Sequence, residues 1–221
     1  MKKIIFFTIW FTLLLIAFLT LIGVTPLSFA LGSSARLTNF IQRGLGLFAF
    51  SMLFVQIILG AFMKKISAKL GGWVFNFHVF EGILAYVLVF LHPIFFLLSN
   101  YFSGGKFDPY VAFINVCLIC KTPTDYYQTI GRISFWLLSI SVFAAFFRKT
   151  IPWLKSNWRK FHVLNYLVFL LVGAHGFLIG TDFRSQPFFT FAILAYLTVF
   201  GMVIFIELPR LYKNFRNWVR S

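Results

Sequence analysis

Residues 158–180 read WRKFHVLNYLVFLLVGAHGFLIG, an apolar stretch that carries two histidines, His162 and His175. An apolar run of this length is typical of a helix that crosses a lipid bilayer, which needs about 20 residues. Ionisable side chains inside such a helix are costly, and they usually face a cavity, a partner side chain or a cofactor. The stretch therefore predicts a membrane helix whose histidines have a specific role.

The composition of the whole chain also indicates a membrane protein. Of the 221 residues, 60% are hydrophobic and only 11% are charged, too few to cover a soluble fold of this size. The formal net charge is +15. In a soluble protein this excess would suggest a nucleic-acid partner. Here we interpret it as positive-inside topology and attraction to anionic lipid, with no nucleic acid bound.

Six apolar segments are long enough to cross a bilayer as helices. The first follows Lys2 and Lys3, as in a signal peptide, but it exceeds the ~7–15 apolar residues of a signal core. We expect it to remain as a helix. No linker or repeat divides the chain, so we expect residues 1–221 to form one domain. We predict that this domain is an all-α integral membrane bundle of six transmembrane helices. The predicted spans are 4–24, 40–63, 74–98, 129–147, 161–179 and 188–206.

The basic residues predict how the bundle is oriented. Most of the 20 Lys and Arg residues fall at the N-terminus, in the loops after the second and fourth spans, and in the C-terminal tail. The positive-inside rule then places both termini in the cytoplasm, and we expect a multi-pass protein of the inner, cytoplasmic membrane. In the tail, Leu211, Phe215 and Trp218 fall at helical spacing and predict a short amphipathic helix along the membrane.

All four histidines of the chain fall in the third and fifth predicted spans. Both spans start at the cytoplasmic side, so His78 and His162 are expected near the inner leaflet and His92 and His175 near the outer one. At 1.5 Å per residue the two levels are about 20 Å apart. Two imidazoles facing each other form the ligand set of a b-type haem, and the chain offers two such sets. Zinc is disfavoured because it prefers four ligands.

Helix geometry places the two histidines on one face in the third span but not in the fifth. At about 100° per residue, His78 and His92 share one face of the third span, whereas His162 and His175 lie about 140° apart on an ideal helix. We therefore expect tilt, side-chain rotamers or an irregularity near Gly173 to bring the second pair to one face.

The pattern H-x13-H in the third of six spans and H-x12-H in the fifth resembles the ferric reductase-like transmembrane domain. This family includes the membrane part of NADPH oxidases, ferric reductases and stand-alone bacterial haem subunits. The resemblance covers essentially the whole chain. The motifs QRG at 42–44, GR at 131–132 and WRKFH at 158–162 add to it.

This resemblance implies a cofactor, a direction of electron transfer and a partner. His78 and His162 would bind an inner b-type haem, and His92 and His175 an outer one, with electrons passing from the cytoplasm to the outer face. We expect the chain to lack a flavin domain, so FAD or FMN is expected on a separate cytoplasmic flavoprotein reductase. Phe96 stands where oxygen-reducing members carry a further histidine. The outer acceptor is left open among ferric iron, a periplasmic methionine sulfoxide reductase and oxygen.

Four other residues in or near the spans have predicted roles. Arg43 and Arg132 lie at predicted outer ends of spans, as candidate partners of the outer haem propionates or as ordinary interfacial cations. Glu81 is a candidate proton carrier, a candidate partner for the second nitrogen of a ligand histidine, or a neutral glutamate open to water. Pro93, directly after His92, is expected to bend the third span.

The predicted outer loop at 100–128 contains the only two cysteines, Cys117 and Cys120. Covalent c-type haem attachment would need histidine where Lys121 stands. The pair is compatible with a structural disulfide, with two free thiols or with a redox-active pair, and the first two are favoured. The apolar run 111–119 predicts a short interfacial helix.

Two other functions remain open. A quinol-oxidising respiratory cytochrome b also pairs histidines across the membrane, but usually on its second and fourth helices. A haem-free transporter or scaffold would use membrane histidines for hydrogen-bonded packing.

Overall fold

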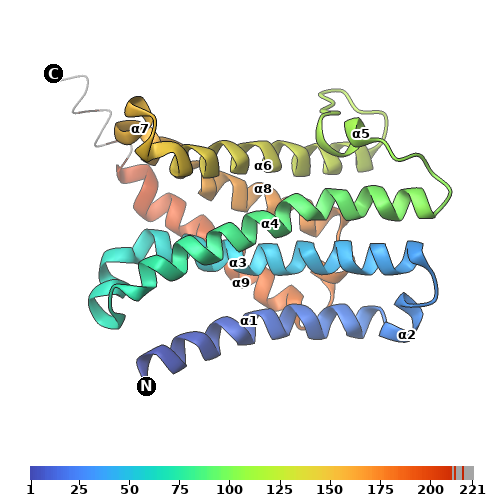
Figure 1. The fold of residues 1–221 in the computed structure, drawn as a ribbon, viewed down its shortest axis with the longest axis horizontal. Coiled ribbons are helices and arrows are strands. Elements are labelled where there is room, and N and C mark those ends of the chain that lie inside the picture. The colour runs from blue at the N-terminus through green and yellow to red at the C-terminus, as the bar shows by residue number, and fades with distance from the viewer. Residues whose placement is uncertain (211, 213–215, 217–221) are drawn as a thin grey trace.

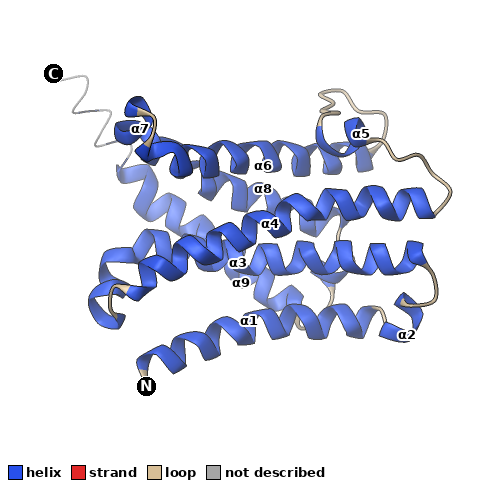
Figure 2. Cartoon of the chain, in the orientation of Figure 1, coloured by secondary structure: helices blue, strands red, loops and turns tan. Residues whose placement is uncertain are grey.

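The computed structural model of the chain is a bundle of long helices that lie side by side (Figure 1). It describes residues 1–210, Tyr212 and Arg216, so the predicted tail helix through Leu211, Phe215 and Trp218 lies outside the described residues. Within the described part, helices are joined by loops and there is no strand (Figure 2). The α-helices are α1 Lys2–Val24, α2 Leu27–Ala30, α3 Ser34–Leu70, α4 Trp73–Phe102, α5 Pro109–Phe113, α6 Pro123–Phe146, α7 Pro152–His162, α8 Leu164–Ile179 and α9 Phe188–Met202. Short 3-10 turns cover η1 Phe147–Lys149 and η2 Asp182–Arg184, and a π-helical segment, η3 Val203–Glu207, extends α9.

The long helices of the described chain are suited to a membrane. The helices α1, α3 and α4, the helix α6 together with η1, and the helix α9 together with its continuation to Arg210 are each long and apolar enough to cross a bilayer. The helices α7 and α8 form a sixth candidate span if the two, bent by 41°, are taken together. The prediction of an all-α, multi-pass membrane bundle is confirmed at this level.

Local sequence signals explain where several helices begin. The side chain of Ser33 accepts a hydrogen bond from the backbone of Arg36 and so caps the first turn of α3. A capping box between Thr122 and Asp125, with Pro123 in the first turn, starts α6. Gly71, at φ +105°, makes the tight turn between α3 and α4.

Some predicted bounds differ from the structure. The limits predicted for the short helix over 111–119 are wrong. The helix α5 spans Pro109–Phe113, because Asp108 caps it from the N-terminal side. The helix α3 is longer than its predicted span and has non-helical dihedral angles at Phe62. The helix α4 contains Pro93 in its interior, and the bend expected there stays a prediction.

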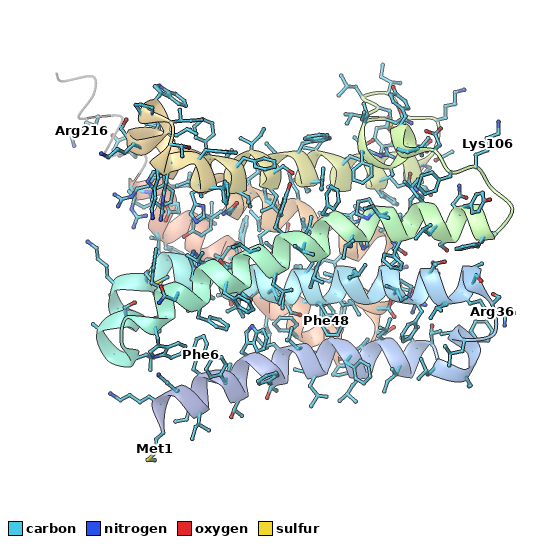
Figure 3. All side chains as sticks on the ribbon, viewed as in Figure 1. Met1, Phe6, Arg36, Phe48, Lys106 and Arg216 are labelled. Atoms are coloured by element: carbon cyan, nitrogen blue, oxygen red, sulfur yellow. A yellow bond between two sulfur atoms is a disulfide. The ribbon has the colours of Figure 1, made fainter. Side chains whose placement is uncertain are left out.

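The two ends of the bundle carry different parts of the chain. Met1 and Arg216 lie at one end, and Arg36 and Lys106 lie at the opposite end (Figure 3). The Lys2 side chain donates a hydrogen bond to the carbonyl of Lys69, so the start of α1 and the end of α3 share the first end. We call the end with Met1 and the last residues of α3 the basic end. The opposite end, with α2 and α5, is called the loop end (Figure 1).

The packed centre of the bundle is aromatic. The ring of Phe50 on α3 is fully buried and stacks on Phe169 of α8, with ring centroids 4.6 Å apart. Edge contacts join Phe50 to Phe183 of η2 and to Phe188 at the start of α9. These rings fix α3, α8 and α9 to one another, so α8 is held firmly within the bundle.

A buried ion pair ties the loop-end side of α3 to the segment before α9. The Arg43 guanidinium donates to both carboxylate oxygens of Asp182, at 2.6 Å and 2.5 Å, and to the hydroxyl of Thr25 at 2.7 Å. The Asp182 side chain is only 4% exposed. A buried carboxylate needs such partners, because an unpaired charge inside a protein is strongly destabilising.

Replacing Arg43 with Met is expected to lower stability by about 3 kcal/mol, because it leaves the Asp182 carboxylate buried without a counter-charge. Thermal unfolding of the purified protein in detergent measures this effect. Arg36→Met is the matched control, since Arg36 lies on the same helix and is exposed. Equal melting temperatures for the two variants would contradict the role given to the ion pair.

Candidate functional site

The histidines nearest the basic end form a close pair. His78 lies in the second turn of α4, and His162 is the last residue of α7. Their ring centroids are 6.2 Å apart, with ring planes at 80°. A transition metal bonded to two imidazoles at about 2.1 Å from each nitrogen would hold the centroids roughly 6.5 Å apart. The spacing of this pair therefore fits a metal centre held between two imidazoles.

The break between α7 and α8 explains how His162 reaches this position. The chain bends by 41° at Val163, directly after His162. His162 and His175 are therefore on different helices, and the 140° separation calculated for one ideal helix does not apply. An irregularity was expected near Gly173; it lies at Val163 instead, ten residues earlier in the chain.

The second pair, His92 and His175, lies toward the loop end. His92 lies in α4 and His175 in α8. His92 Nδ1 lies 2.8 Å from the carbonyl oxygen of Gln42, and His175 Nδ1 lies 2.7 Å from that of Tyr127. A carbonyl oxygen only accepts, so each Nδ1 carries its proton and each Nε2 keeps its lone pair. Such bonds orient metal-binding histidines and fix their tautomer.

Glycines face the rings of three of these histidines. A Cβ atom at Gly131 of α6 would lie 2.9 Å from ring atoms of His175. At Gly46 of α3 it would lie 3.1 Å from His92, and at Gly60 it would lie 3.9 Å from His78. The rings of His92 and His175 therefore occupy space that any larger residue at Gly46 or Gly131 would take.

The helices α4 and α8, which carry His92 and His175, do not pack closely on each other. The helix α4 packs mainly along α3, and α8 packs mainly on α6, while α4 and α8 make few close approaches. Each of the four histidine residues is half-buried within the bundle. His175 Nε2 has no hydrogen-bond partner in the described part of the chain, and His92 Nε2 has only a long contact, 3.5 Å, with the side-chain nitrogen of Gln42. At the other level, the 6.2 Å spacing of His78 and His162 fits a group held between two imidazoles, such as haem.

The two pairs differ in the hydrogen bonds made by their Nδ1 atoms. His78 Nδ1 is buried and has no hydrogen-bond partner within the described residues. His162 Nδ1 has only a long contact, 3.4 Å, with the side-chain nitrogen of Asn165. The pair near the basic end is therefore less firmly oriented than His92 and His175. Among the residues that the structure describes, no group of three or more His, Cys, Asp or Glu side chains is placed to hold a metal ion.

The two candidate arginines lie near the loop end, and both have protein partners. Arg43 bonds to Asp182 and Thr25, as described above. Arg132 is buried in α6 and donates to the carbonyl oxygen of Asn115 at 2.6 Å and to Gln128 at 2.9 Å. Arg132 directly follows Gly131, which faces the His175 ring, so α6 brings a positive charge to the turn beside this histidine.

Glu81 belongs to a separate polar cluster between α1, α3 and α4. Its carboxylate accepts hydrogen bonds from Trp10 Nε1, at 3.3 Å, and from the side chain of Gln56. Gln56 also donates to the backbone oxygen of His78 at 2.9 Å. Glu81 is fully buried, so the expectation of a water-accessible glutamate is wrong. It contacts the backbone turn of His78 through Gln56 rather than bonding a histidine ring.

Several residues of this site carry no clear signal in the sequence. Gln42 and Tyr127 contribute backbone oxygens, which every residue type has. Gly46 and Gly131 do carry a signal, because a glycine within a membrane helix permits close approach of a bulky group. The motifs QRG and GR contain Gln42 and Gly131, but their geometric role appears only in the structure.

Comparison with protein-family models, curated proteins and solved structures finds no match to this chain. The geometry of the two histidine pairs therefore carries the functional assignment.

Proposed function

We propose that this protein is a di-haem b-type membrane cytochrome that passes electrons across the membrane, as members of the ferric reductase-like family do. The observation that carries the proposal is the pairing of all four histidines at two levels. The spacing of His78 and His162 supports ligation at one level. The backbone bonds of His92 and His175 at Nδ1, which leave the Nε2 lone pairs to other partners, support it at the other, where His92 Nε2 has only a long 3.5 Å contact with the Gln42 side chain.

Each pair of residues would hold one cofactor. When bound at these positions, a b-type haem supplies a one-electron carrier at each level. The protein's own residues orient the imidazoles through the carbonyls of Gln42 and Tyr127 and keep the rings in a largely apolar bundle. The charge of Arg132 beside the outer pair favours a negatively charged propionate there.

The direction of transfer follows from the proposed topology. Basic residues gather at the basic end of the described chain, including Lys64, Lys65, Lys155 and Arg159. The positive-inside rule places this end, and both termini, in the cytoplasm, with the loop end outside an inner membrane. Electrons would then reach the inner pair first and leave from the outer pair.

The proposed donor is an acidic cytoplasmic flavoprotein that carries FAD or FMN. Attraction to the basic end would bring its flavin close to His78 and His162. Such an encounter is steered by charge, so its rate depends on ionic strength. A quinol donor would instead reach the protein through the lipid, and its rate would depend little on salt.

We expect haem reduction in proteoliposomes by a flavin reductase with NAD(P)H to slow about tenfold between low salt and roughly 0.5 M salt, where charges are screened within a few ångströms. The rate is read from the haem absorbance after mixing. Lys64→Gln with Lys65→Gln should weaken the salt dependence, whereas Lys106→Gln at the loop end should not. Rapid reduction by a quinol, with none by reduced flavin or flavoprotein, would overturn the proposed donor.

A further inference from the structure

The outer cysteines form a disulfide between Cys117 and Cys120, in the irregular segment between α5 and α6. This segment is fixed to the bundle on both sides of the disulfide. Arg132 donates to the carbonyl of Asn115, and Trp136 donates to the carbonyl of Phe113 at 2.7 Å. The capping box at Thr122 holds the other side.

The disulfide contacts the same turn of α6 that contacts His175. The Thr129 hydroxyl accepts from the backbone N–H of Cys117 at 3.3 Å and lies 3.4 Å from its sulfur. Tyr127, two residues earlier, accepts the hydrogen bond of His175 Nδ1, and Gly131, two residues later, faces the His175 ring. Two residues correspond to about 3 Å along a helix axis. The sulfur of Cys117 is thus adjacent to the turn on which the His175 ring lies.

The disulfide also presents an apolar surface to the outside. The two residues between the cysteines, Leu118 and Ile119, are 87% and 93% exposed. Exposed apolar side chains of this kind favour contact with another protein. Lys121 follows Cys120 directly, and a nearby cation favours the thiolate form of a reduced cysteine.

A purely structural role explains this disulfide poorly. A disulfide stabilises mainly by closing a loop of the unfolded chain, and the gain is smallest for short loops. Cys117 and Cys120 are only three positions apart. The segment is already tied down by the bonds of Arg132, Trp136 and Thr122, so this short bridge adds little to its anchoring.

We propose that the Cys117–Cys120 disulfide is redox-active, accepts electrons from the haem that His92 and His175 would hold, and delivers them to disulfides of proteins outside the membrane. This inference rests on the proposed cytochrome function and names its acceptor as a protein disulfide. Cys117, which lies against α6, is on the side where electrons arrive. Cys120, beside Leu118, Ile119 and Lys121, is on the side that meets the external protein.

The chemistry balances within this scheme. The Cys117–Cys120 bond takes up two electrons, one at a time, from the outer site and two protons from water. The S–S bond breaks and two thiols form. The Cys120 thiolate then attacks an external disulfide to form a mixed disulfide, and Cys117 displaces the external protein. That protein leaves as a dithiol, and the Cys117–Cys120 bond is restored.

The test counts electrons and thiols in the purified holoprotein under anaerobic conditions. Photoreduced flavin is added in measured amounts while the haem absorbance is recorded. Samples are treated with a mass-tagged maleimide, which labels only free thiols. The wild type is expected to take up two more electrons per chain than the Cys117→Ser/Cys120→Ser variant, and to gain two labels as its haems become reduced.

His175→Ala and His92→Ala show whether the electrons pass through the outer site. In these variants labelling should be at least tenfold slower, while the inner haem, still reduced in the same sample, reports a folded protein. Equal labelling in the wild type and in these variants would overturn the inference, as would reduced haems with no labelling in the wild type. The proposed cytochrome would survive both results. A protein with no haem bands would overturn the cytochrome and the inference together.

Discussion

Replacing His92 or His175 with alanine is expected to remove the outer haem and leave the inner haem bound. Each variant deletes one of two ligands at one level, and a single remaining imidazole does not retain the group firmly. His78 and His162 lie on other helical turns, with ring centroids 6.2 Å apart, and do not depend on the outer pair. The haem content per chain, measured by extraction and by the reduced spectrum, should fall by about half.

The corresponding changes at His78 or His162 should remove the inner haem, with the outer one retained. Transmembrane electron transfer from a cytoplasmic donor should then stop, because the first carrier is absent. Phe205→Ala is a suitable control, since that side chain is 80% exposed on the bundle surface. A full complement of haem in all four histidine variants would show that the pairs are not the ligands.

Substitution of Gly131 by alanine is expected to have the second largest effect, which is loss of the outer haem with the inner one intact. The new Cβ would lie 2.9 Å from Cε1 and Nδ1 of His175, closer than side-chain carbons are found in proteins. The ring would have to move away from the carbonyl of Tyr127, which now fixes its orientation. A ligand displaced in this way binds its metal poorly.

A graded series of glycine variants makes this prediction sharper. Gly46→Ala should have a smaller effect on the outer haem, because its Cβ would lie 3.1 Å from His92. Gly60→Ala, at 3.9 Å from His78, should leave both haems in place. Gly201→Ala is the matched control, with nothing within 4 Å of the added atom. Haem content is the measurement, and equal content in Gly131→Ala and Gly201→Ala would refute the packing role of Gly131.

The sequence predicts the helical spans well and the site in part. Apolar runs of about 20 residues reveal membrane helices because lipid forces the backbone to bond within each span. The break at Val163 carries no comparable signal, since no proline or glycine marks it. A helical wheel therefore separates His162 from His175 by an angle that the bent α7–α8 pair does not have.

Long-range partners were the least predictable features. Arg43 and Asp182 are 139 positions apart, and nothing in either local sequence identifies them as an ion pair. Glu81 is one turn from His78 in sequence, yet its carboxylate bonds to Trp10 of α1 and Gln56 of α3. These contacts depend on how helices are arranged around one another, and the local pattern of a single helix does not encode that arrangement.

The haem content and redox spectrum of the purified protein test the central claim most directly. The four paired histidines predict two b-type haems per chain, each six-coordinate and low-spin, with reduced b-type absorbance bands that disappear on oxidation. A correctly folded protein, expressed with ample haem, that shows no such bands would contradict the assignment and favour a haem-free membrane protein.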